Sequence, residues 1–376
     1  MKVRGSFSSV GMPYPRNLTS PTYEYNEATQ SWKPKTHYPI GDLKPERTDS
    51  WEVGLDMKLF KDFNLGLSWY LANTFNQTFD PQISVSSGYT TIYLQTGYVR
   101  NTGLELSLGY GHTWNNNFRW DSNFTLSHNK NKIKELVRDY VHPETGELIN
   151  KDRLDVGGLG KARFILKEGG TLGDLYTQSD LKRDDNGMVD IDPTGIVAIE
   201  NNLPDIKLGS VFPKANLAWS NHFSWKGISL SALFTARIGG IVYSATEAAM
   251  DQYGVSERSA LARDNGGVLV NNRTLVDAQN YYTTIGSESG LPQYYTYNAT
   301  NVRLQEASIG YLIPRKWLGN VWDIQVSVIG RNLWMIYNKA PFDPESVATT
   351  DNYYQGIDYF MLPSTRNIGF NVKINF

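Results

Sequence analysis

Two groups of tyrosines have the clearest capacity for binding chemistry in this sequence of 376 residues. Aromatic faces can stack on sugar rings or pack against peptides, and each phenol adds a hydrogen-bonding group. We therefore expect the two segments that hold them to bind an oligosaccharide or a peptide. The alternative is that the rings pack one loop against another, or against a protein partner. The candidate residues are Tyr281, Tyr282, Tyr294, Tyr295, Tyr353 and Tyr354.

The acidic segment Asp184–Asp192 suggests a calcium loop at first sight. An EF-hand loop places acidic residues at positions 1 and 12 around a glycine at position 6. With Gly187 at the sixth position, Lys182 stands first and Pro193 twelfth, so the pattern fails. The Asn-Gly pair in this segment favours a tight hairpin turn instead.

The remaining candidates for catalysis or cofactor binding are also weak. Gly157–Lys161 resembles a phosphate-binding loop, but Ala162 stands where a magnesium-binding Ser or Thr is required, so we expect a flexible loop. No two histidines have the spacing of metal ligands on one helical turn. The histidines are His37, His112, His128, His142 and His222. We expect no catalytic residue, metal or cofactor.

Composition excludes several classes of protein. No apolar run approaches the roughly 18 residues of a membrane-spanning helix. The formal net charge of −2 gives no indication of nucleic-acid binding. The chain has no cysteine, so disulfides and thiolate metal sites are excluded.

Alternating apolar and polar residues dominate the pattern. The last strand is the clearest case: Ile368, Phe370, Val372 and Ile374 alternate with polar or small residues, and Phe376 ends the chain. Such alternation predicts a strand with one apolar and one wet face, as in an outer-membrane β-barrel. A terminal aromatic residue such as Phe376 resembles the assembly signal of bacterial outer-membrane proteins. We predict ten strands, at about 2–10, 47–60, 63–75, 101–113, 117–129, 213–225, 227–242, 300–313, 321–335 and 365–376.

The connections between these strands alternate between short and long, as in up-and-down membrane barrels with periplasmic turns and long extracellular loops. Four tryptophans lie beside the short turns, as a periplasmic aromatic belt requires: Trp114, Trp225, Trp317 and Trp322. The expected long extracellular loops are about 11–46, 76–100, 130–212, 243–299 and 336–364. A soluble sandwich or propeller is the alternative, but its strands are usually shorter.

Charged residues alternate with the apolar positions of several strands, and we expect them to face a wet lumen or a plug. They are Asp56, Lys58, Glu105, Arg119 and Asp121. The alternation also shifts phase between Leu304 and Ala307, which predicts a β-bulge. The predicted fold is therefore all-β: an antiparallel up-and-down transmembrane β-barrel with about ten strands.

Several motifs resemble TonB-dependent receptors, and the most specific ones resemble the C-terminal half of the SusC/RagA-like family of Bacteroidetes. The general motifs are Leu43-Lys44-Pro45-Glu46, Ser50–Leu55 and Asn101-Thr102-Gly103-Leu104-Glu105-Leu106. The specific motifs are Lys207-Leu208-Gly209, Phe212-Pro213-Lys214, Asn301-Val302-Arg303-Leu304, Ser308-Ile309-Gly310-Tyr311, Arg331-Asn332-Leu333 and Phe342-Asp343-Pro344-Glu345. Their order and spacing agree from end to end.

The resemblance implies that residues 1–376 are the C-terminal portion of a 22-stranded barrel, without its N-terminal plug and first twelve strands. It further implies import of a large nutrient, an oligosaccharide or a peptide, driven by TonB acting through the plug. A SusD-like surface lipoprotein would cover the extracellular loops, and the location would be the outer membrane of a Gram-negative bacterium. The rival hypothesis is a self-contained ten-stranded outer-membrane barrel: a protease, a porin or an adhesin.

Overall fold

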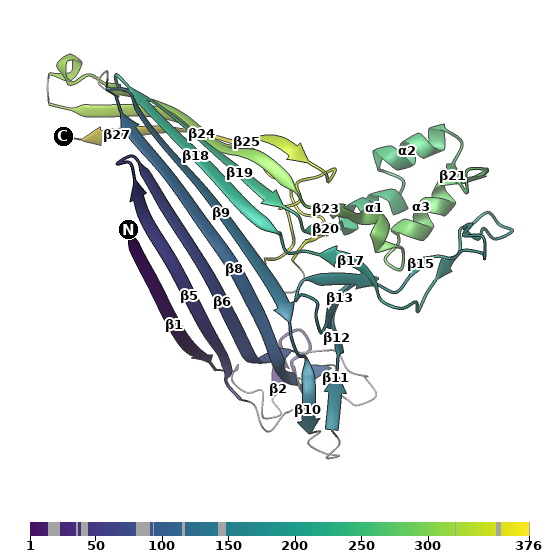
Figure 1. Ribbon diagram of the computed structural model, residues 1–376. Coiled ribbons are helices and arrows are strands. Elements are labelled where there is room, and N and C mark those ends of the chain that lie inside the picture. The colour runs from purple at the N-terminus through teal and green to yellow at the C-terminus, as the bar shows by residue number, and fades with distance from the viewer. Residues whose placement is uncertain are drawn as a thin grey trace.

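The computed structural model describes residues 1–13, 23–34, 37–38, 44–79, 91–92, 94–114, 117–141, 148–319, 321–350 and 355–375. One large sheet runs diagonally across the molecule, and a folded unit lies beyond one end of its strands (Figure 1). No helix in these residues is long and apolar enough to span a membrane.

The large sheet has ten strands, each antiparallel to the next and in chain order, which is the predicted up-and-down topology. Its strands are β1 (Lys2–Met12), β5 (Glu46–Leu59), β6 (Phe63–Phe79), β8 (Leu94–Thr113), β9 (Arg119–Ile133), β18 (Ala215–Trp225), β19 (Ile228–Ile238), β24 (Asn301–Ile313), β25 (Asp323–Asn338) and β27 (Asn367–Asn375). All ten predicted strands are confirmed. Within the described residues β1 and β27 are edge strands that do not pair with each other, so the sheet is a partial barrel rather than a closed ten-stranded one.

Strand register gathers the apolar residues on one face, which we call the outward face. Leu55 pairs with Leu67, Leu67 with Leu106, and Leu106 with Leu126, so four leucines form one row across the sheet. The opposite face, which we call the inner face, carries the alternate polar residues. The predicted bulge is also present, because Gln305 is left without a partner in both neighbouring ladders.

The predicted aromatic belt lies at the end of the sheet with the short turns. The four tryptophans there are 38 to 66% exposed: Trp114, Trp225, Trp317 and Trp322. At the same end, Trp120 packs edge-on against Tyr110, with ring centroids 5.1 Å apart, and stacks on Phe223 at 5.8 Å. This belt of amphipathic rings is suited to a membrane interface.

The long connections form further secondary structure at the other end of the strands. The small strands are β2 (Tyr23–Asn26), β3 (Ser31–Pro34), β4 (His37–Tyr38), β7 (Thr91–Ile92), β10 (Val137–Val141), β11 (Leu148–Lys151), β12 (Arg153–Leu159), β13 (Ala162–Lys167), β14 (Asp174–Thr177), β15 (Asp180–Leu181), β16 (Ile199–Glu200), β17 (Ile206–Ser210), β20 (Ile241–Ser244), β21 (Val268–Val270), β22 (Thr274–Val276), β23 (Thr296–Asn298) and β26 (Ile357–Asp358). The helices are α1 (Ala245–Gln252), α2 (Glu257–Asp264), α3 (Ala278–Gly286), η2 (Pro292–Tyr295) and η3 (Arg315–Leu318), of which η3 lies in a short turn.

Two expectations about these connections need correction. The predicted loop at 76–100 is shorter, because β6 continues to Phe79 and β8 begins at Leu94. The segment Gly157–Lys161, predicted to be a flexible loop, completes β12 and turns tightly into β13, with Leu159 paired to Ala162. Gly160 has a φ of +55°, a conformation that glycine adopts at little cost.

The main hydrophobic core lies in the long connections rather than in the sheet. Side chains such as Leu136, Phe164, Leu175 and Leu291 are at most 1% exposed and belong to one cluster. A barrel wall exposes its apolar side chains to lipid, whereas segments in water need a core of their own. We call the unit built from the described residues within 131–212, 240–300 and 340–358 the loop domain.

Candidate functional site

The inner face of the sheet is polar and holds two cavities of about 690 and 590 Å³. All five charged residues predicted to face a wet interior line one or the other. Asp56 and Glu105 line the larger cavity, and Lys58, Arg119 and Asp121 line the smaller one. The register that turns leucines outward therefore turns these residues inward.

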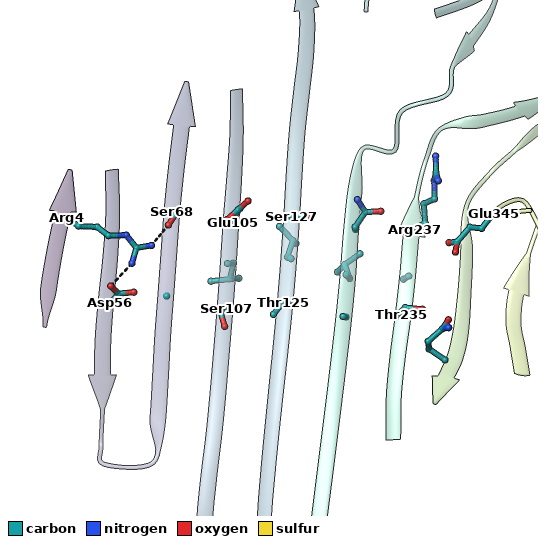
Figure 2. A pocket seen from close by; sticks show the side chains of 18 residues that line it. Arg4, Asp56, Ser68, Glu105, Ser107, Thr125, Ser127, Thr235, Arg237 and Glu345 are labelled. Atoms are coloured by element: carbon teal, nitrogen blue, oxygen red, sulfur yellow. Dashed lines mark hydrogen bonds and ion pairs between the residues drawn. The ribbon is translucent and has the colours of Figure 1, made fainter. Parts of the chain in front are cut away.

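Arginine–carboxylate pairs organise this face. Arg4 binds Asp56 at 2.7 Å and donates to the hydroxyl of Ser68 at 2.6 Å (Figure 2). Arg119 makes two hydrogen bonds to Asp121, at 2.6 and 2.7 Å. These exposed pairs add little stability, but they keep the surface hydrophilic.

Glu105 differs from these carboxylates. It makes no hydrogen bond or ion pair with another described residue, and it borders both the large cavity and a smaller one of about 280 Å³. Tyr70 and Phe212 line the smaller cavity too. The Tyr70 ring lies against Gly103, where a Cβ atom would be 2.2 Å from the ring, so alanine at this position would force the ring to move.

A buried ion pair closes the base of the loop domain. The Arg303 guanidinium donates to both Asp343 carboxylate oxygens, at 3.1 and 2.8 Å, and to Asn301 Oδ1. Burial disfavours the Asp343 carboxylate, but hydrogen bonds from Arg303 and the Glu345 backbone N–H outweigh it, so its pKa is lowered. Two sequence motifs, Asn301–Leu304 and Phe342–Glu345, thus meet in space. The sequence analysis did not predict this pairing. The signal available in the sequence was the opposite charge of Arg303 and Asp343.

Two of the six candidate tyrosines pack inside the loop domain. Tyr282 is 9% and Tyr295 1% exposed. The Tyr295 hydroxyl donates to Asp251 at 2.9 Å, and the Arg258 guanidinium lies 5.0 Å above its ring. Burial, reinforced by Asp251, raises the pKa of Tyr295. In this arrangement both rings position α1, α3 and η2.

Tyr281 and Tyr294 lie at the edge of the same core and are only partly buried. Burial raises the pKa of Tyr281 to about 12, so its phenol stays neutral at physiological pH. Tyr353, Tyr354 and Phe376 lie outside the described residues. The structure therefore brings four of the candidate tyrosines together, two as core residues and two at its rim.

The other polar motifs have structural partners. Asp184 Oδ1 accepts backbone hydrogen bonds from Asn186 and Met188, which forms the predicted turn. The turn recurs at Asp192, a repeat that the sequence analysis missed. Three histidines each lie within hydrogen-bonding distance of a neighbour: His112 of Asp62, His128 of the Lys214 carbonyl and His222 of Ser231. In the described part of the chain no His, Asp and Glu side chains are grouped to hold a metal.

Comparison with families and curated proteins gives consistent matches. Residues 1–182 match the family model "TonB dependent receptor-like, beta-barrel". TonB-dependent receptor P3 of Formosa agariphila is 25% identical over 372 residues, covering 90% of this chain and 35% of that protein. TonB-dependent receptor P26 of the same organism is 24% identical over 362 residues, covering 89% and 35%. The chain thus spans about a third of the length of these relatives.

Solved structures agree with these matches at the level of the fold. The RagAB peptide importer in its closed-closed state superposes with a TM-score of 0.69 at 18% identity, covering 99% of this chain and 40% of that one. Its open-open state gives 0.68 at 18% identity, covering 99% and 39%. The proteins found are receptors and transporters rather than enzymes.

Proposed function

Since this chain has the β-barrel fold of TonB-dependent outer-membrane receptors, we propose that it forms part of the wall and mouth of a TonB-dependent nutrient importer. The observation that carries the proposal is the division of the sheet into an apolar outward face and a polar inner face with two cavities. A lipid-facing wall around a wet path requires this division.

The energy for import would come from TonB through an N-terminal plug. The matched stretch is 35% of the length of each relative, so the rest of such a protein has room for a plug and further strands. The polar inner face, with a Glu105 carboxylate that has no hydrogen bond or ion pair among the described residues, is the surface that a plug or a solute would meet. Transport is therefore proposed for the full-length receptor.

The proposed solute is a large nutrient, either an oligosaccharide or a peptide. The RagAB structures are of a peptide importer, and partly exposed tyrosines suit peptide packing as well as sugar stacking. We propose that Tyr281 and Tyr294 contact the solute together with Tyr353 and Tyr354. Tyr282 and Tyr295 would contribute indirectly, through the core of the loop domain.

A SusD-like surface lipoprotein is the proposed partner, placed as a lid over the loop domain in the outer membrane of a Bacteroidetes-type bacterium. Several apolar side chains of the loop domain are more than half exposed, which supports a protein contact there. They are Tyr253, Val255, Leu261, Leu269 and Leu275. Curated relatives from Formosa support the proposed group of bacteria.

Uptake by cells that produce the full-length receptor tests this function. Fluorescent oligopeptides and oligosaccharides would be supplied to wild-type cells, to cells without TonB and to cells with the Tyr353→Ala/Tyr354→Ala receptor. We expect TonB-dependent uptake of one class, and at least tenfold weaker solute binding by the tyrosine variant. TonB-independent uptake of both classes would contradict the proposal.

A matched control comes from the same connection of the chain. Tyr359 and Phe360 are 54 and 60% exposed and pack on each other, 5.1 Å apart. The Tyr359→Ala/Phe360→Ala variant removes two aromatic rings from the same connection and leaves Tyr353 and Tyr354 in place. It should bind solute as the wild type does, and equal losses in both variants would count against a specific role for Tyr353 and Tyr354.

A further inference from the structure

A cluster of cations lies on the outward face of β8 and β9, beside the loop domain. The residues that β8 and β9 direct outward include Leu104, Leu106 and Leu126, and the same alternation continues to Arg100, Lys130 and Lys132. Arg100 is the register partner of Lys132, and Lys130 lies two residues along β9. Paired strands are about 5 Å apart and alternate residues about 7 Å, so the three cations form one group. We call it the basic cluster.

The basic cluster continues directly into the apolar part of the outward face. The next outward row after Lys130, toward the short turns, contains Leu104 and its register partner Trp69, which are 39 and 42% exposed. The row after that is the row of four leucines described above. This apolar band is the surface that faces lipid chains. The cations therefore lie at its loop-side margin, which corresponds to the outer-leaflet headgroups when the long connections are extracellular.

The charges of this cluster are not neutralised by the described part of the chain. The Arg100 Nε donates to Asn73 at 2.9 Å, a neutral partner. Lys130 and Lys132 make no hydrogen bond or ion pair with another described residue. Asp49 lies at the same level on β5, but it already binds Arg47 at 3.1 Å and accepts from a serine.

Farther along the sheet, the corresponding outward positions at the loop-side ends carry uncharged residues: Ile238 on β19, Val302 on β24 and Tyr337 on β25. On the other side, Arg47 of β5 is a further outward cation, but it is paired with Asp49. A general attraction to a charged membrane would place cations all around the barrel. A group on two adjacent strands indicates a discrete ligand.

We propose that the basic cluster binds the phosphate-bearing headgroup of an outer-leaflet lipid, with its acyl chains against the leucines below. Lys and Arg form strong charge-assisted hydrogen bonds with phosphate oxygens. Their long side chains can extend from an apolar surface to the headgroup region. The ligand must be amphipathic, since the cations and the lipid-facing apolar band form one continuous surface. This proposal needs only the membrane-embedded barrel and is independent of which solute is imported.

Binding of lipid A monophosphate to the full-length receptor in neutral-lipid nanodiscs tests the proposal. The Lys130→Gln/Lys132→Gln variant should bind it about 25-fold more weakly, from roughly 1 kcal/mol for each basic residue near an anionic lipid surface. Adding Arg100→Gln should weaken binding further. Dephosphorylated lipid A should bind wild type and variants with the same low affinity.

The matched control is Lys226→Gln/Lys316→Gln, which removes two lysines from the short-turn end of the sheet and should leave binding unchanged. Heat-modifiable mobility in gels shows whether each variant is folded. If the double variant does not fold, Lys130→Gln and Lys132→Gln are tested singly, and each should bind the lipid about fivefold more weakly than the wild type. Equal binding by wild type and Lys130→Gln/Lys132→Gln would overturn the proposal. So would equal binding of phosphorylated and dephosphorylated lipid, or complete displacement by millimolar inorganic phosphate.

Discussion

Replacing Asp343 by alanine should loosen the base of the loop domain, because it leaves the Arg303 guanidinium buried without its charged partner. The two side chains are 9 and 7% exposed, and two hydrogen bonds join them. Removing one partner of such a buried pair costs about 3–5 kcal/mol. The cost reflects the uncompensated cation more than the lost contact.

Asn301 and Glu345 also lie beside the Arg303 guanidinium, so we expect a loss of stability at the low end of that range. Arg303 keeps its hydrogen bonds to Asn301 Oδ1, both 3.2 Å long. Glu345 lies 3.5 Å from the guanidinium, although its side chain is 42% exposed and therefore well solvated. We expect Asp343→Ala to cost about 3 kcal/mol, which raises the equilibrium for local opening on the order of a hundredfold.

Amide hydrogen exchange of the receptor in bilayers measures this opening for residues 301–304 and 340–348. The control is Glu306→Ala, which breaks an exposed pair between β24 and Arg331 of β25 and should cost at most about 1 kcal/mol. The double variant Arg303→Met/Asp343→Leu should recover most of the stability, since an apolar pair replaces the ionic one. Equal exchange in Asp343→Ala and Glu306→Ala would refute the reasoning.

Two further predictions concern other parts of the molecule. The hydrogen bond from Arg153, together with the one from Lys167, lowers the pKa of Asp205 although the carboxylate is buried. Because the folded-state pKa is below the unfolded-state pKa of about 4, the Asp205 carboxylate stabilises the fold fully above about pH 4. This stabilisation is lost as the pH falls below that value. Thermal unfolding at pH 7, 5 and 3 should show a smaller loss of Tm for Asp205→Asn than for the wild type, and parallel losses would contradict the assignment. Gly103→Ala should destabilise the barrel by about 1–3 kcal/mol, because its Cβ would overlap the Tyr70 ring. Urea titration of the heat-modifiable fold measures the effect, which Tyr70→Leu should relieve; an unchanged midpoint in Gly103→Ala would count against the steric argument.

The strands and their two faces could be predicted from the sequence because both depend on local information. A side chain's face follows from its parity along the strand, so Leu55 and Leu67 point one way and Asp56 the other. The bulge at Gln305 could be found for the same reason, as a phase shift in that parity. The resemblance to a known receptor family extended this local pattern to an architecture.

The candidate site was harder to predict, because burial is not a local property. Tyr281 and Tyr282 are adjacent in the sequence and equally aromatic, yet one lies at the rim of the loop domain and the other inside it. The difference depends on helix α3 and on what packs against it. Alternation along a strand carries no information about a core assembled from segments more than a hundred residues apart.

By itself, the sequence determined that this chain forms long antiparallel strands with an apolar and a polar face, since that pattern repeats every two residues. Only the tertiary structure decided which residues meet across strands and connections. Arg303 finds Asp343 forty residues away, and Arg100 lies beside Lys132 because β8 and β9 pair in one register. A shift of one residue in that register would send either side chain to the opposite face. Register depends on the turns and on the packing of the whole sheet, which is why these two sites became visible only in the folded protein.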